Sequence, residues 1–112
     1  MANLYELKNK SVEYAKEVIL SYISADKINQ LLLYGSFARN MATYKSDVDM
    51  ALFIKPDTLT IKQKRQLKSE AMPPDIHLPE VDLHIFDGFL DEYDDAYFNA
   101  IKRDGKEITI GR

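Results

Sequence analysis

Cysteine is absent from this chain of 112 residues. Without cysteine, the chain can form neither a disulfide framework nor a zinc site with cysteine ligands. Long apolar runs are also absent. No segment is long enough to cross a bilayer, and residues 1–6 lack the apolar core of a signal peptide. We therefore expect a cytoplasmic protein that makes no contact with a membrane.

A large excess of one charge is absent as well. The 15 Lys and Arg residues and the 18 Asp and Glu residues give a formal net charge of −3 at pH 7. Proteins that bind nucleic acids usually have a basic surface, so this balance argues against direct DNA binding. Hydrophobic residues make up 46% of the chain, which is enough for one modest core but leaves no room for a second. We expect a single domain that spans residues 1–112.

The most informative feature that is present is a pair of acidic residues at the start of an apolar run. Asp47 and Asp49 lead into the apolar residues 50–54. In an extended chain alternate side chains share a face, so the two carboxylates project together with their Cα atoms about 6 to 7 Å apart. Two like charges at this separation repel each other, and a hard divalent cation between them relieves the repulsion. The pattern indicates a metal site.

A short glycine turn lies ten residues before this acidic pair. Residues 28–34 form an apolar run typical of a buried strand, and Gly35 ends it. Residues 36–42 have helical character, with Ser36 as the expected N-cap. Gly35 allows close approach of the backbone, and the start of a helix offers free N–H groups to a phosphate. We therefore expect a phosphate-binding turn.

The remaining elements follow from hydrophobic periodicity and from turn residues. Residues 81–86 alternate in polarity like a strand, with Asp82 near its start. Thr60 and Gln63 form a capping-box pattern at the start of a helix. Three amphipathic helices are expected at residues 11–24, 57–72 and 90–103.

The positions of the polar residues on their strands predict the topology of the sheet. Gly35 and Ser36 lie at the end of their strand, whereas Asp47 and Asp49 lie at the start of theirs, so these groups can meet only if the two strands are antiparallel. Asp82 is also at the start of its strand, which should therefore run parallel to that of Asp49, with a crossover helix between them. The expected fold is an α/β (α+β) domain with a small mixed sheet packed against helices.

The order and spacing of these motifs form one pattern: Gly35-Ser36, Ala38-Arg39, and then Asp47-x-Asp49. This pattern resembles the signature of the polymerase-β-type nucleotidyltransferase superfamily, in particular its minimal nucleotidyltransferase (MNT) branch. The resemblance extends over nearly the whole chain, from the leading helix to the closing one. One departure is Asn40, where the family commonly has glycine. Asn tolerates a left-handed backbone better than most residues, so we expect the turn to be kept.

The resemblance implies a set of catalytic and metal-binding residues. In this superfamily a third carboxylate on a neighbouring strand completes the metal site, and Asp82 stands where it is expected. Asp47, Asp49 and Asp82 would then hold one or two Mg²⁺ ions, with Asp82 as the general base or as a ligand of the second ion. ATP would be the nucleotide substrate.

The nucleotide-binding residues implied by the resemblance are Gly35, Ser36 and Arg39. Ser36 and the N–H groups that follow it would hold the β- and γ-phosphates. Arg39 has two interpretations, either as a phosphate ligand or as a surface residue that pairs with a carboxylate. Nucleotidyl transfer depends on positioning and charge neutralisation more than on covalent chemistry, so a small scaffold is sufficient.

Three functions are compatible with this resemblance. The first is transfer of AMP from ATP to a hydroxyl group, in the first place a tyrosine, of a partner protein, as the antitoxin of an HEPN/MNT toxin–antitoxin pair is understood to do. The partner would then be an HEPN toxin. The protein could form a hetero-oligomer with this partner or a homo-oligomer of its own chain. The second is nucleotidylation of a small molecule, as aminoglycoside nucleotidyltransferases do. The third is a non-catalytic binding module that neutralises its partner by occlusion.

Two features of the sequence separate these functions. Relatives that modify antibiotics usually contain an added domain that shapes the acceptor pocket, and 112 residues leave no room for one. The complete set of Asp47, Asp49 and Asp82 argues against an idle binding module. We therefore expect a Mg²⁺-dependent protein adenylyltransferase that acts as an antitoxin.

Other polar and aromatic residues are expected to be structural. His84 shares a strand face with Asp82 and is expected to be a hydrogen-bonded structural histidine. The basic residues 62–68 are expected to form the solvated face of a helix. Tyr93 and Tyr97 fall on the apolar stripe of the last helix, so core packing is their expected role.

Overall fold

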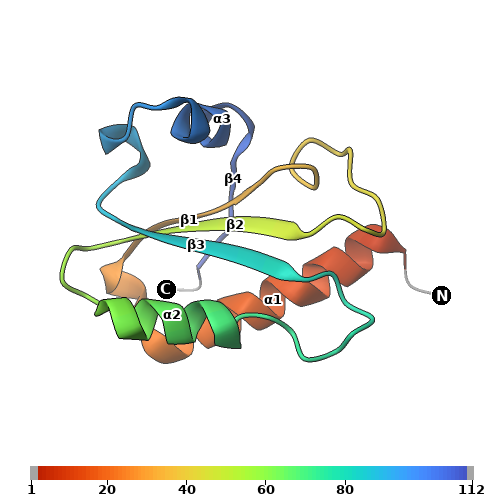
Figure 1. The fold of residues 1–112 in the computed structure, drawn as a ribbon, viewed down its shortest axis with the longest axis horizontal. Coiled ribbons are helices and arrows are strands. Elements are labelled where there is room, and N and C mark those ends of the chain that lie inside the picture. Colours follow the sequence, from red (N-terminus) through yellow and green to blue (C-terminus); the bar gives the residue numbers. More distant parts are fainter. Residues whose placement is uncertain (1–2, 111–112) are drawn as a thin grey trace.

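The computed structural model describes residues 3–110, and Figure 1 shows their arrangement. The helices and strands follow one another as α1 (Leu4–Tyr22), β1 (Ile28–Tyr34), β2 (Val48–Ile54), α2 (Ile61–Glu70), β3 (Val81–Asp87), α3 (Ala96–Asp104) and β4 (Lys106–Glu107). Two short 3₁₀ helices, η1 (Ala25–Lys27) and η2 (Leu90–Glu92), precede β1 and α3. In this part of the chain, no helix combines the length and the apolar composition needed to span a membrane.

The strands form one mixed sheet with the order β3-β2-β1-β4. β1 and β2 are antiparallel, whereas β2 and β3 are parallel, with α2 in the connection between them. These are the predicted strand directions, so the expected fold class is confirmed. β4 pairs with β1 at the edge of the sheet and is not among the predicted strands, because a two-residue strand has no periodicity to detect.

Helices cover both faces of the sheet, with α1 and α2 on one face and α3 on the other (Figure 1). The side chains of the central strand β2 alternate between two hydrophobic cores. The core that contains residues of α1 and α2 receives four of them, Val48, Met50, Leu52 and Ile54. Ala51 and Phe53 belong to the second core, with Phe98 and Ile101 of α3. By the same alternation Asp49 shares this second face.

The first helix is longer than predicted. α1 begins at Leu4 rather than at residue 11, because the side chain of Asn3 caps it. Asn3 Oδ1 accepts a hydrogen bond from the N–H of Glu6 at 2.9 Å. Most of residues 5–10 are polar, so hydrophobic periodicity detects only the later turns.

The second helix is shorter than predicted but begins at the predicted capping box. Gln63 N–H donates to Thr60 Oγ1 at 3.1 Å, and Thr60 N–H donates to Gln63 Oε1 at 2.8 Å. Asp57 lies before this helix with φ at 65°, in the left-handed region, and so cannot be part of it. The helix therefore occupies Ile61–Glu70 instead of residues 57–72.

The last helix, predicted at residues 90–103, is divided into η2 and α3. Asp95 causes the division by acting as the N-cap of α3, where its Oδ1 accepts a hydrogen bond from the N–H of Phe98 at 3.1 Å. An N-cap residue has an extended backbone, so the helix cannot continue through it. α3 is therefore a separate helix that lies over the second core.

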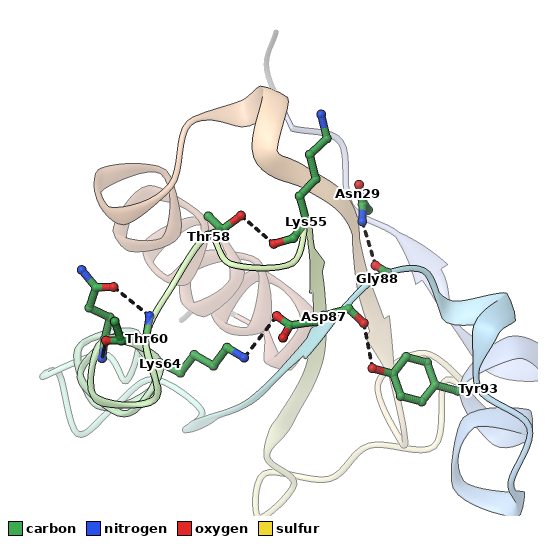
Figure 2. Close-up of polar contacts among 9 residues, drawn as sticks. Asn29, Lys55, Thr58, Thr60, Lys64, Asp87, Gly88 and Tyr93 are labelled. Carbon is green, nitrogen blue, oxygen red and sulfur yellow. Dashed lines mark hydrogen bonds and ion pairs between the residues drawn. The ribbon is translucent and has the colours of Figure 1, made fainter.

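Polar contacts close the end of the sheet where β2 and β3 finish (Figure 2). Lys64 Nζ of α2 lies 3.1 Å from Asp87 Oδ1, at the last residue of β3. The Tyr93 hydroxyl donates to the C=O of Asp87 at 2.7 Å, and Asn29 Nδ2 donates to the C=O of Gly88 at 2.8 Å. These bonds link β1, β3, α2 and the segment before α3 into one unit.

The helix predicted at residues 36–42 is a single turn in the structure. Arg39 N–H donates to the C=O of Gly35 at 3.1 Å, so Gly35 takes the capping position expected of Ser36. Asn40 has φ at 58° and ends the turn. The bonds that close it have the pattern of a Schellman motif, with a left-handed residue at the C′ position.

The left-handed backbone at Asn40 gives a first prediction. Asn40→Ala should lower the free energy of unfolding by about 1 kcal/mol, because a Cβ without a local polar group is strained in this region. Asn40→Gly should leave the stability unchanged or raise it slightly. Urea unfolding would measure both variants. Asn9→Ala, within α1, is the matched control and should not destabilise the protein; equal stability of the two Asn40 variants would contradict the prediction.

Candidate active site

The strand register places one residue from each of three neighbouring strands in a row. Tyr34 at the end of β1 pairs with Asp49 on β2, and Asp49 pairs with Asp82 on β3. Adjacent strands lie about 4.8 Å apart, so the two carboxylates are close neighbours at the same end of the sheet. Asp49 is half-buried, whereas the side chain of Asp82 is 51% exposed. We call Asp49 and Asp82 the carboxylate pair.

Asp47 lies just before β2 and is exposed. Its negative charge contributes to raising the pKa of Asp49, so the two carboxylates interact electrostatically. Among residues 3–110, however, no group of three or more acidic, histidine or cysteine side chains is arranged so that it could coordinate a metal ion. The structure therefore brings Asp49 and Asp82 together on neighbouring strands and leaves Asp47 exposed just before β2.

Burial is the main cause that raises the pKa of Asp49. The negative charges of Asp82 and Asp47 raise this pKa further, while His84 and Arg39 oppose the effect. Burial and the two acidic neighbours penalise the ionised carboxylate, whereas His84 and Arg39 favour it. Asp49 is thus a carboxylate that a positive charge in the cleft would stabilise strongly.

Gly35 packs directly against the Asp49 carboxylate. Its φ is +75°, in the region that favours glycine, and a Cβ built at this position would lie 2.2 Å from Asp49 Oδ2. No side chain fits in that space without displacing the carboxylate. The glycine predicted for close approach of the backbone is therefore required by Asp49 as well as by the turn.

A cleft of about 370 Å³ opens beside Asp49. The turn after β1 forms one wall and α3 forms the other, and the lining residues are Tyr34, Gly35, Ser36, Arg39, Asp49, Tyr97, Ala100 and Asp104. Every residue predicted to bind the nucleotide therefore lines this one cleft. We refer to it below as the active-site cleft.

Two tyrosines in the active-site cleft were missed as site residues. The hydroxyl groups of Tyr34 and Tyr97 are 2.6 Å apart, and Tyr97 is 41% exposed rather than part of the core. Burial and the hydrogen bond to Tyr97 raise the pKa of Tyr34, so its phenol stays neutral. The amphipathic stripe of α3 could not reveal this, because Tyr97 lies at the margin of the stripe where it borders the cleft.

Arg39 pairs with a carboxylate, as one of its two predicted interpretations has it, and the phosphate interpretation stays a prediction. It lines the cleft, and its Nη1 lies 3.8 Å from Asp104 Oδ2. Hydrogen bonds from Arg103 to Asp104 are the main cause that lowers the pKa of this carboxyl, so it is ionised at neutral pH. The position of Asp104 in the cleft was not predicted, because the C-terminal end of a helix shows no pattern that points to a distant turn.

His84 contacts Asp82, as their shared strand face suggested. Its Nε2 lies 3.3 Å from Asp82 Oδ2. The imidazole ring stacks on Phe86 at 6.4 Å between centroids and meets Tyr97 at 6.1 Å. These contacts hold the ring in place, which is consistent with the structural role predicted for it.

The fold and the cleft together define a small α+β domain with a carboxylate pair beside a glycine turn. A family described as polymerase beta, nucleotidyltransferase matches residues 16–108. Since this match covers most of the chain, the protein belongs to that nucleotidyltransferase family, as the sequence motifs indicated. No curated protein matches the chain significantly.

Two solved structures are similar to this fold. A candidate nucleotidyltransferase from Sulfolobus solfataricus has a TM-score of 0.61 and 16% identity, over 96% of this chain and 87% of that one. A chain of a toxin–antitoxin complex with AMP-PNP has a TM-score of 0.54 and 19% identity, over 82% of this chain and 70% of that one. At these identities the similarity establishes the fold.

The raised pKa of Asp49 gives a second prediction. Asp49→Asn should raise the melting temperature of the metal-free protein at pH 7 by a few degrees. The folded pKa lies above the unfolded one, so the wild type loses stability as pH rises through that window, and the variant does not. Below about pH 3, under the ordinary aspartate pKa of roughly 4, the advantage should vanish because both states are protonated.

Thermal unfolding from pH 3 to pH 8 would test this prediction. Asp94→Asn removes the same charge at an exposed position outside the cleft and should not reproduce the effect. If the melting temperature of Asp49→Asn at pH 7 is equal to or lower than that of the wild type, the ionised carboxylate of Asp49 does not destabilise the folded protein.

Proposed function

We propose that the protein is a metal-dependent nucleotidyltransferase that transfers AMP from ATP to a hydroxyl group of a partner protein. The observation that carries the proposal is the pairing of Asp49 with Asp82 on neighbouring strands, with Asp49 lining a cleft that also contains Gly35, Ser36 and Arg39. A carboxylate pair next to a turn with free backbone N–H groups suits a metal-bound triphosphate.

The residues at this site fit a hard divalent cation. Their donor atoms are carboxylate oxygens, which Mg²⁺ prefers. The pKa of Asp49 is raised by burial and by the charges of Asp82 and Asp47, so a cation there removes a repulsion that the protein otherwise bears. Asp47 and Asp49 would hold it, and Asp82, which pairs with Asp49, would act as the general base. A bound Mg²⁺ would supply charge neutralisation at the triphosphate.

The other residues of the cleft would position the nucleotide. Ser36 and the backbone of its turn would donate to the β- and γ-phosphates, and Arg39 would exchange its partner Asp104 for a phosphate oxygen. Tyr97 and the small side chain of Ala100 line the wall of α3 and would face the nucleoside. Aromatic rings provide a stacking surface for a base.

The proposed transfer is a single displacement at phosphorus. The acceptor oxygen forms a bond to the α-phosphorus of ATP, and the bond from that phosphorus to the oxygen bridging to the β-phosphate breaks. Pyrophosphate leaves with the electron pair of the broken bond. The hydroxyl proton of the acceptor passes to the carboxylate of Asp82, which is exposed to an incoming acceptor.

We further propose that the acceptor is a tyrosine of a toxin of the HEPN class, so that the protein acts as an antitoxin. The motifs resemble those of MNT antitoxins, and the structurally similar toxin–antitoxin complex with AMP-PNP supports this choice of partner. The side chain of Asp82 is 51% exposed, which allows a protein surface to present its hydroxyl to this carboxylate.

A third prediction concerns the metal. Calorimetric titration with ATP should show at least about tenfold weaker binding when chelator replaces Mg²⁺, because Asp49, Asp82 and Asp47 repel the triphosphate unless a cation neutralises them. The Asp47→Ala/Asp49→Ala double variant should lose most of this dependence. ATP affinity that is the same with Mg²⁺ and with chelator would refute the metal assignment.

A fourth prediction tests the transfer itself. When a toxin of the HEPN class is co-expressed as the partner with the wild type, intact-mass spectrometry should show one or more added AMP groups on the partner. These adducts should disappear with Asp47→Ala/Asp49→Ala, while the control Asp94→Asn should retain them. A partner that is silenced without modification would indicate occlusion instead, and labelling of an aminoglycoside or another metabolite would indicate a small-molecule acceptor.

A further inference from the structure

Two loops flank a second hollow beside the active-site cleft. One loop connects β1 to β2 and the other connects α2 to β3, and both lie at the end of the sheet where β2 and β3 begin (Figure 1). The hollow has a volume of about 380 Å³, and we call it the loop hollow. Its lining residues are Tyr44, Lys45, Ser46, Asp47, Ile76, Leu78, Pro79 and Glu80.

Each loop exposes a large apolar side chain at the hollow. Tyr44 is 75% exposed and Ile76 is 91% exposed. Isolated apolar residues on a surface are common, but these two come from separate loops and line the same hollow. The pair therefore forms an apolar contact surface rather than two unrelated exposures.

Hydrogen bonds within the first loop fix the position of Tyr44. Thr43 N–H donates to Ser46 Oγ at 2.9 Å, and Ser46 N–H donates to the C=O of Thr43 at 3.0 Å. The N–H of Lys45 donates to Thr43 Oγ1 at 3.3 Å. Tyr44 thus lies at the tip of a closed turn.

The second loop is fixed in a similar way. His77 N–H donates to Asp75 Oδ1 at 2.9 Å, which places Ile76 at the tip of a turn. Farther along, the hydroxyl of Ser11 donates to the C=O of Pro79 at 2.7 Å, and this serine is completely buried in α1. Both loops therefore hold their apolar residues before any partner arrives, which lowers the entropic cost of binding.

The charge around the loop hollow is mainly acidic. Asp47 and Glu80 line it, and Asp75 lies next to Ile76, whereas Lys45 is the one basic residue of the lining. Asp47 is also one of the carboxylates proposed for the metal site. The loop hollow therefore shares Asp47 with the proposed metal site and has a charge that attracts basic groups.

We propose that the loop hollow is the docking site of the acceptor protein, which it binds through a basic segment with an apolar anchor. The apolar side chain would pack between Tyr44 and Ile76, and its basic neighbours would face Asp75 and Glu80. This places the acceptor hydroxyl next to Asp47 and the carboxylate pair. The inference rests on the proposed function, because it assigns the surface that selects the acceptor.

Short peptides provide a direct test. The probe is a fluorescein-labelled octapeptide with one tyrosine, one leucine and four arginines, and its two controls replace the arginines by glutamates or the leucine by serine. Fluorescence anisotropy would measure binding at about 0.15 M salt, near physiological ionic strength. The basic peptide should bind the wild type at least tenfold more tightly than it binds Tyr44→Ser/Ile76→Ser, while the controls should bind weakly to both.

Matched variants separate the loop hollow from the rest of the surface. Ile61→Ser removes an isoleucine that is 69% exposed on α2 and should leave peptide affinity unchanged. Glu80→Lys should weaken the basic peptide and strengthen the acidic one. Mg²⁺-ATP affinity, measured by calorimetry, should be the same in Tyr44→Ser/Ile76→Ser as in the wild type, because neither residue lines the active-site cleft.

The outcomes distinguish this inference from the proposed transfer. Loss of peptide binding in Tyr44→Ser/Ile76→Ser with unchanged ATP affinity supports docking. If radiolabelled ATP then fails to label the peptide bound to the wild type, the transfer proposal fails while the docking proposal stands. Labelling or binding that persists in the double variant overturns docking. Docking is also overturned if the basic peptide fails to bind the wild type or if the acidic peptide binds more tightly. It is overturned as well if the wild type forms a dimer and Ile76→Ser abolishes this dimerisation.

Discussion

The pairing of β2 with neighbours on both sides is the constraint on which the site depends. β2 pairs with β1 in the antiparallel direction on one side and with β3 in the parallel direction on the other. Its five apolar residues from Met50 to Ile54 are completely buried. A shift of one residue would send these side chains to the wrong faces, so the register is held by the cores. The same register places Asp49 between Tyr34 and Asp82. Hydrophobic burial thereby positions a carboxylate pair that electrostatics alone would separate.

The two ends of the sheet have opposite characters. Where β2 and β3 finish, Lys64, Asp87 and Tyr93 connect the surrounding elements by hydrogen bonds and an ion pair. Where these strands begin, neither Asp49 nor Asp82 forms an ion pair with a Lys or Arg side chain of residues 3–110, and the adjoining loops expose Tyr44 and Ile76. Stability is thus concentrated at one end, and the other end keeps charge and apolar surface available for ligands. Such local compromise in stability is typical of functional sites.

α3 connects the site to the core. Its buried face packs Phe98 and Ile101 under the helix, while Tyr97, Ala100 and Asp104 form a wall of the active-site cleft. The hydrogen bond between Tyr34 and Tyr97 joins this wall to the end of β1. The width of the cleft is therefore set by how α3 packs on the sheet, and a change in the second core would alter the cleft from a distance.

The sequence by itself determined the first three strands, their directions, the glycine turn and the acidic residues, because these depend on local chemistry: alternation, backbone freedom and charge spacing. It also identified the capping box at Thr60. Only the tertiary structure decided that Tyr97 and Asp104 line the cleft, that Asp47 does not, and that Tyr44 and Ile76 share a hollow. These facts arise from contacts between segments far apart in the chain, set by packing of α3 and by the loops around the sheet. A single sequence has no periodic signal for such contacts.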